Sequence, residues 1–139
     1  MSQRILLPPG WPRPHGYSNG IAAEGRLVFT AGQIAWDETN VIQTDSMAGQ
    51  VAQTLKNTVA VLAEAEAEPR HIVRMTWYIT SRSEYLEHAK EIGRIWREII
   101  GKHYPAMAVI EVSALIESAA KVEIETTAVV PPCTNPHNE

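Results

Sequence analysis

The sequence YPAMAVIEVSALIESAAKVEIETTAVV, residues 104–130, decides the fold of this chain. It holds two runs of apolar and β-branched residues, 108–115 and 122–130, and this composition predicts two strands. The connection between them, residues 116–120, is short enough for a hairpin, so the two strands are expected to pair with each other. Apolar residues occupy odd and even positions of the first run, which is typical of a strand that is covered on both faces.

The residues before this stretch show two kinds of periodicity. In two segments apolar residues recur at spacings of three and four, which places them on one face of a helix. Two other segments are rich in Val, Ile, Thr and aromatic residues, as strands are. The expected elements are strands at 27–30 and 71–80, a helix from Asp45 to Pro69, and a helix from Ser81 or Ser83 to Gly101.

This order of elements predicts an α+β fold, in which two helices pack on one face of a mixed β-sheet. The 139 residues fit a single domain, which we place at 1–130, and the Pro-rich segment 131–139 is expected to be a disordered tail. Two helices cover only one face of the sheet. We therefore expect the second face to be covered by self-association of the chain.

Composition excludes several classes of function. The formal net charge is −4 and the 12 Lys and Arg residues are scattered, so no nucleic-acid surface is expected. The single cysteine, Cys133, excludes a disulfide framework, and the five histidines lack metal-ligand spacing. No apolar run approaches the roughly 20 residues of a membrane span, and the first residues lack the features of a signal peptide. We expect a cytoplasmic protein without membrane contact, metal or cofactor.

Five short motifs occur in an order and at a spacing that resemble the Rid family of reactive-intermediate deaminases, the YjgF-like proteins. The resemblance runs from about Tyr17 to Val130. It implies a chorismate-mutase-like fold that assembles into a trimeric barrel, with helices outside and active sites in clefts between subunits. The motifs are GYSN at 16–19, VFTAGQI at 28–34, a helix with Gln53, Asn57 and Leu62, YPA at 104–106, and VEIE at 122–125.

The resemblance also implies a set of site residues. Deaminases of this family hydrolyse imines or enamines made from amino acids, such as 2-aminoacrylate, to ammonia and a keto acid. By motif, Glu123 holds the attacking water and Tyr17 lines the pocket, while the backbone around Gly32 and Val109 contacts the substrate. An arginine directly after the Pro-Ala pair holds the substrate carboxylate, and this chain has Met107 at that position.

Met107 separates this chain from the deaminating members of the family. A thioether has neither the charge nor the donors of a guanidinium, and losing such a pair removes about 2–5 kcal/mol of binding. Weak activity on 2-aminoacrylate is therefore expected, with Met107 and Trp36 forming an apolar wall for a different imine. Arg13 or Arg26 is an alternative source of a cation, and Trp36 is alternatively packed at a subunit contact.

Three functions follow from these patterns. The first is a homotrimer that hydrolyses an imine or enamine in an intersubunit pocket, with substrate recognition that differs from the family's. The alternative is a trimer that binds a small metabolite without catalysis. Separately, Glu123 and Glu125 are alternatively two residues of a solvated stretch of strand without a functional role. The third, a ribonuclease or translation inhibitor, is disfavoured by the acidic net charge.

Overall fold

The computed structural model describes residues 3–132, so the expected tail at 131–139 lies almost wholly outside the described residues. Within them the chain forms six strands, three α-helices and one short 3-10 helix. In chain order these are β1 (Gln3–Leu6), β2 (Gly20–Ala23), β3 (Arg26–Phe29), α1 (Met47–Glu64), η1 (Pro69–His71), β4 (Ile72–Ile79), α2 (Arg82–Glu87), α3 (Ala89–Ile99), β5 (Ala106–Glu111) and β6 (Val122–Val130).

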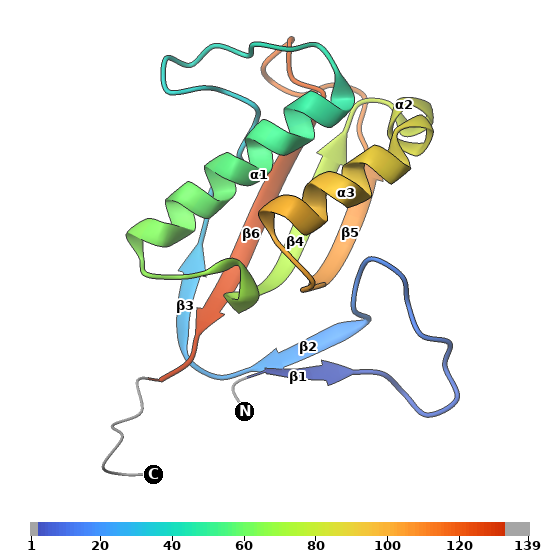
Figure 1. The fold of residues 1–139 in the computed structure, drawn as a ribbon, viewed down its shortest axis with the longest axis vertical. Coiled ribbons are helices and arrows are strands. Elements are labelled where there is room, and N and C mark those ends of the chain that lie inside the picture. The colour runs from blue at the N-terminus through green and yellow to red at the C-terminus, as the bar shows by residue number, and fades with distance from the viewer. Residues whose placement is uncertain (1–2, 133–139) are drawn as a thin grey trace.

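The predicted α+β fold with a mixed sheet is confirmed. Four strands form a sheet in the order β3-β6-β4-β5, and β1 and β2 form a separate antiparallel pair. Within the large sheet β4 and β5 run parallel, whereas β6 is antiparallel to both β3 and β4. The helices α1 and α3 lie across one face of this sheet (Figure 1). The opposite face carries no helix of the described residues.

The predicted hairpin between the last two strands is wrong. The strand β4 lies between β5 and β6 and pairs with both of them. Its side chains Met75 and Trp77 are buried under the helices, as is typical of a central strand. A short connection permits a hairpin but does not choose the partner strand, and here the parallel β4–β5 crossover through α2 and α3 decides the pairing.

The helices begin where capping side chains are available. Ser46 caps α1, because its Oγ accepts a hydrogen bond from the N–H of Gly49 at 2.8 Å. Ser81 caps α2 in the same way, through the N–H of Glu84 at 3.1 Å. The second predicted helix is divided into α2 and α3 at His88, whose ψ of 16° departs from helical geometry.

The core lies between the helices and the sheet, and it contains one buried polar side chain with every bond satisfied. Gln50 of α1 is fully buried. Its Nε2 donates to the carbonyls of Thr44 and Ala119, and its Oε1 accepts from the N–H of Lys121 at 2.7 Å. Buried polar groups are tolerated when they are paired in this way. Gln50 thus fastens the start of α1 to the loop that leads into β6.

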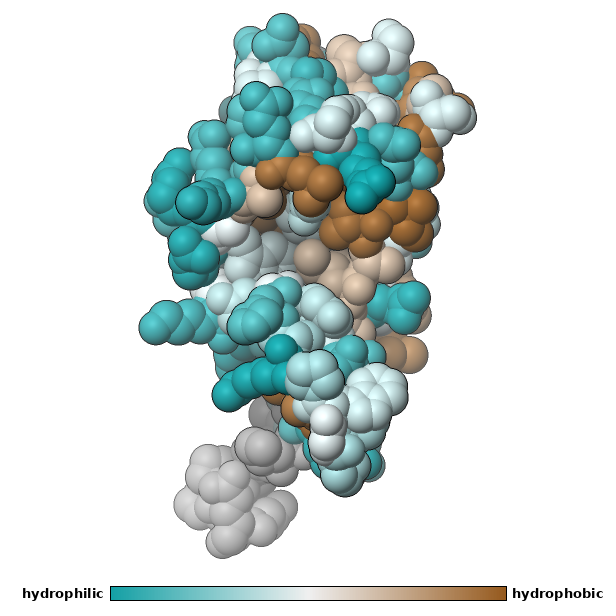
Figure 2. Space-filling model, turned by 90° about the vertical axis from the view of Figure 1, so that its right-hand side faces the viewer, coloured by the Kyte–Doolittle hydropathy of each residue, from teal (hydrophilic) through white to brown (hydrophobic). Residues whose placement is uncertain are grey.

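The open face of the sheet exposes large apolar side chains. Phe29 and Leu27 of β3 are 68% and 60% exposed. Tyr78 of β4 lies on this face as well and donates a hydrogen bond to Glu125 of β6 at 2.8 Å. Ile110 is half-exposed on β5, and hydrophobic side chains gather on the upper part of the side of the molecule that carries β5 (Figure 2). A surface of this kind is typical of a subunit contact.

A buried histidine makes the stability of the fold depend on pH. His71 is 5% exposed, and its Nδ1 accepts a hydrogen bond from the N–H of Glu68 at 2.9 Å. Its Nε2 has no partner among the described residues. Burial, followed by the charge of Arg70, lowers the pKa of His71 below its ordinary value of 6.5. Protonation would also place a donor against the N–H of Glu68.

The neutral form of His71 is the one that the fold stabilises, so its contribution is complete above about pH 6.5 and declines as the pH falls below that value. We expect the free energy of unfolding to fall more steeply between about pH 7.5 and pH 5.5 in the wild-type protein than in His71→Gln. Urea unfolding of both proteins at the two pH values measures this difference. Parallel losses in the two proteins would contradict the role of His71.

Candidate functional site

Glu123 of β6 lies against the backbone of Gly32. The chain leaves β3 after Phe29 and pairs with β6 again at Gln33, whose N–H donates to the carbonyl of Ile124 at 2.8 Å. Gly32 therefore passes directly beside the Glu123 side chain. A Cβ atom at Gly32 would lie 2.2 Å from the Glu123 carboxylate, so only glycine admits the carboxylate in this position.

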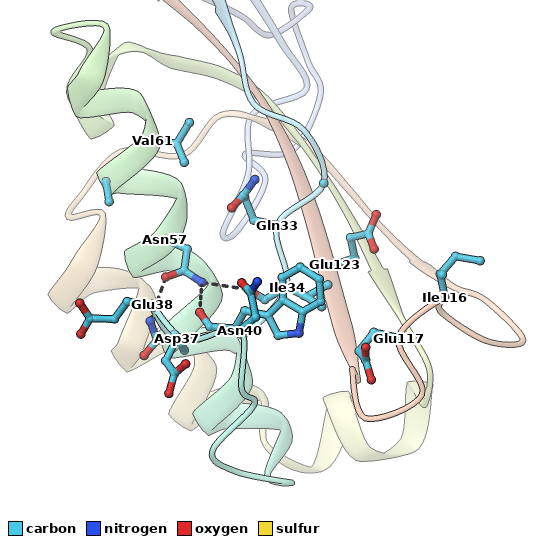
Figure 3. A pocket seen from close by; sticks show the side chains of 14 residues that line it. Gln33, Ile34, Asp37, Glu38, Asn40, Asn57, Val61, Ile116, Glu117 and Glu123 are labelled. Atoms are coloured by element: carbon cyan, nitrogen blue, oxygen red, sulfur yellow. Dashed lines mark hydrogen bonds between the residues drawn. The ribbon is translucent and has the colours of Figure 1, made fainter.

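The loop after Gly32 is held in place by two polar side chains. Asn57 of α1 donates from Nδ2 to the carbonyls of Ile34, at 2.9 Å, and Trp36, at 2.7 Å. The carboxylate of Asp37 accepts bonds from Gln43 and from Thr39, and these bonds hold its pKa far below the ordinary value. Both anchors fix the loop that carries Trp36 (Figure 3).

These residues border a groove of about 710 Å³. Gly32, Trp36 and Glu123 all line it, and the exposed Ile116 stands at its rim from the loop between β5 and β6 (Figure 3). The structure thus brings together three of the site residues predicted from the sequence. The groove is wide enough for a small ligand and still open on one side.

The other predicted residues meet at β5. The N–H of Ser18 donates to the carbonyl of Pro105 at 3.0 Å, and Ser18 forms a parallel bridge with Ala106. This contact ties the early loop to the start of β5 and places Tyr17 beside Met107. Tyr17, Met107 and Val109 line one cavity of about 310 Å³ together with His15, Gly16 and Tyr85.

The two groups of residues lie at opposite edges of the sheet. Glu123, Gly32 and Trp36 are on the side of β3, whereas Tyr17, Met107 and Val109 are on the side of β5. Their side chains also differ in direction. Met107 packs with the core under the helices, and Glu123 alternates with the buried Val122 and Ile124, so it points to the open face. One chain by itself holds the predicted site residues in two separate groups, each a half-site of the predicted intersubunit site.

One of the cavities beside Met107 has a guanidinium at its border, but it belongs to Arg97 and not to Arg13 or Arg26, the two candidates from the sequence. Arg26 donates to the carbonyl of Ala65 at the end of α1. Arg13 lines neither of the two cavities at Met107, and Arg97 of α3 lines one of them. The sequence signal for Arg97 was Gly93, one turn earlier on the same helix face.

Two expected absences concern metals and membranes. Among residues 3–132, His, Cys, Asp and Glu side chains form no cluster of three that would hold a metal ion. Within the same residues, no helix is both long enough and apolar enough to cross a membrane.

Known proteins resemble this chain in both sequence and structure. The family model described as Endoribonuclease L-PSP matches residues 12–130. A conserved Rid-family protein of unknown function from Yersinia pestis has a structure that superposes with a TM-score of 0.83, at 29% identity over 94% of this chain and 100% of that one. This chain belongs to the Rid (YjgF-like) family.

Other relatives cover nearly the whole chain or most of it. A RutC family protein from Synechocystis is 34% identical over 94% of this chain and 99% of its own. A 2-iminobutanoate/2-iminopropanoate deaminase from Salmonella typhimurium is 26% identical over 76% of this chain and 80% of its own. The structure of E. coli TdcF with bound serine superposes with a TM-score of 0.65, at 29% identity over 91% of this chain and 98% of that one.

The contact between Gly32 and Glu123 leads to a structural prediction. In Gly32→Ala the new methyl group requires the carboxylate to retreat by about 1 Å to reach an ordinary contact distance. The end of a glutamate side chain moves easily, so the variant should lose less than about 1 kcal/mol of unfolding free energy. A crystal structure and thermal unfolding of the variant measure both effects. A carboxylate that stays in place while the backbone shifts would contradict the argument.

Proposed function

We propose that this Rid-family chain is a hydrolytic deaminase of imine or enamine intermediates that works as a homotrimer. The observation that carries the proposal is the carboxylate of Glu123, held against Gly32 in an open groove. An imine carbon is already electrophilic, so its hydrolysis needs a positioned water and a path for protons, and both are within the reach of a fixed carboxylate. No cofactor is required by this chemistry.

Assembly between subunits follows from the separation of the two half-sites. A neighbouring chain that brings its β5 edge to the groove of Glu123 would join Tyr17, Met107 and Val109 to Gly32 and Glu123. The exposed Leu27 and Phe29 of the open face supply apolar surface for such a contact. The trimer and the cytoplasmic location expected from the sequence are both parts of this proposal.

The proposed reaction consumes one water and releases one ammonia. The oxygen of the water bonds to the imine carbon while Glu123 accepts a proton from that water. At the same time the electrons of the C=N double bond move to nitrogen. The nitrogen takes up that proton and a second one from solvent. The C–N bond of the resulting carbinolamine then breaks, ammonia leaves, and loss of the hydroxyl proton gives the carbonyl product. Tyr17 and the backbone of Gly32 and Val109 would hold the substrate.

Two other functions compete with this proposal. A trimer that binds a metabolite without catalysis is favoured by Met107, since the position expected to hold the substrate carboxylate lacks a cation. A ribonuclease is the function named in the description of the matching family model. The scattered basic residues and net charge of −4 argue against an RNA surface.

Met107 predicts weak turnover of 2-aminoacrylate. In Met107→Arg the new guanidinium can pair with the substrate carboxylate, and this should raise keto-acid release from 2-aminoacrylate by about tenfold or more. Met107→Gln is the matched control, because it is polar but uncharged and should not raise the rate. The measurement is a coupled assay of keto-acid release.

Glu123→Gln tests the catalytic part of the proposal in the same assay. The amide cannot accept a proton from water, so the Met107→Arg/Glu123→Gln protein should return to the uncatalysed rate. Rapid turnover by the wild-type chain would contradict the argument from Met107. Unchanged turnover after loss of the Glu123 carboxylate would contradict the deaminase mechanism.

A further inference from the structure

A second cavity opens behind Met107 and differs in character from the half-sites. It lies between α3 and the helix-covered face of β4 and β5, and its volume is about 270 Å³. Gly16, Tyr85 and Met107 line both this cavity and the cavity of Tyr17, so the two cavities are neighbours. The wall of the second cavity combines aromatic and aliphatic side chains with one cation, and the side chains that matter here are Trp77, Tyr85, Trp96, Tyr104, Met107 and Arg97.

The aromatic wall is a packed and ordered surface. Trp77 stands edge-on to Tyr85, with ring centres 6.4 Å apart, and Trp96 stacks on Tyr104 at the same separation. Trp77 and Trp96 are themselves 6.1 Å apart. Such pairs hold one another in place, so the cavity is formed before any ligand enters.

Arg97 supplies the charge at this cavity. Among residues 3–132 it takes part in no ion pair, whereas Arg94, one turn earlier, pairs with Glu98 at 2.8 Å and Glu91 at 3.8 Å. Arg97 is exposed, so its guanidinium keeps its hydration until a partner arrives. A free guanidinium beside an apolar cavity is suited to a ligand with an anionic group and an apolar body.

Two further features are unexplained by packing alone. The indole N–H of Trp77 is buried without a partner among the described residues, although Trp77 is only 1% exposed and lines the cavity. By contrast, Trp96 donates its N–H to the carbonyl of His103 at 3.0 Å. A buried donor without an acceptor is costly, so the Trp77 N–H is a polar defect in the packing beside the cavity.

Gly93 is the second feature. It lies in the interior of α3, where glycine costs about 1 kcal/mol relative to alanine. It lines the cavity, and a Cβ atom there would meet only the Arg97 side chain, at 3.5 Å. The missing side chain leaves room for a ligand next to the guanidinium.

From these observations we infer that the cavity bordered by Trp77, Met107 and Arg97 binds a carboxylate with an apolar, ring-sized body. A cavity of about 150 Å³ holds a benzene ring, so 270 Å³ accommodates one ring with a short chain. The carboxylate binds Arg97 and the ring contacts the aromatic wall. The inference rests on the proposed function in one respect only: the cavity adjoins the Tyr17 half-site across Gly16, Tyr85 and Met107, so the deaminase substrates would be imines of amino acids with large apolar side chains.

Binding is tested with 3-phenylpropanoate as the probe and calorimetry as the readout. The wild-type protein should bind 3-phenylpropanoate more tightly than either its neutral amide or propanoate. Because Arg97 is exposed, Arg97→Gln should weaken binding by about three- to tenfold rather than abolish it. Arg94→Gln removes the same charge from the same helix and should leave the dissociation constant unchanged.

Gly93→Leu supplies an independent test, because its side chain would fill the space beside Arg97 and should block the probe while the protein stays folded by circular dichroism. Equal binding by Arg97→Gln, Arg94→Gln and the wild type would overturn the inference, as would equal binding of the amide.

In Glu123→Gln the probe should still bind. Arg97-dependent binding in a protein without any imine hydrolysis would refute the deaminase proposal and leave this inference standing.

Discussion

The position of β4 is the constraint on which the rest of the structure depends. The strand β4 pairs with β5 on one side and with β6 on the other, so it separates the strand of Met107 from the strand of Glu123. The side chains of Met107 and Glu123 also point to different faces of the sheet. Gly32 then brings the backbone to Glu123 at one edge, and Ser18 brings Tyr17 to Met107 at the other. Each half-site is well anchored locally. In the proposed trimer a second chain would bring the two groups together, and the apolar open face would give that chain a place to pack.

Much of this arrangement could be predicted from the sequence. The apolar periodicity located α1 and β4, and the motifs around Gly32 and Glu123 indicated residues that the structure brings into contact. The strand order could not be predicted, because a five-residue connection is compatible with a hairpin and pairing is decided by the burial of the whole strand. Arg97 was missed for a related reason: it lies off the buried stripe of its helix, and only the packing of α3 on β5 brings it to the cavity of Met107.

Met107 and Arg97 together determine where this chain offers a cation to the carboxylate of a proposed substrate. With Met107 directly after Pro105-Ala106, the edge strand β5 offers no cation at that position, while α3 presents Arg97 at the border of an aromatic cavity. An arginine on the strand suits small acids held near the reacting carbon. A guanidinium beside Trp77 and Trp96 instead suits an acid whose apolar body fills the cavity. With either position of the cation, Glu123 remains the group proposed to orient water.

The most direct test of the account is a mixing experiment with two inactive variants, Glu123→Gln and Tyr17→Ala. Each variant is measured alone and after subunit exchange in an equal mixture, by hydrolysis of imines generated in situ from apolar amino acids. If each site takes Glu123 from one subunit and Tyr17 from its neighbour, about one quarter of the sites in randomly mixed trimers hold both intact residues. The account predicts recovery of about that fraction of wild-type activity. An exchanged mixture that stays inactive would contradict a site shared between subunits.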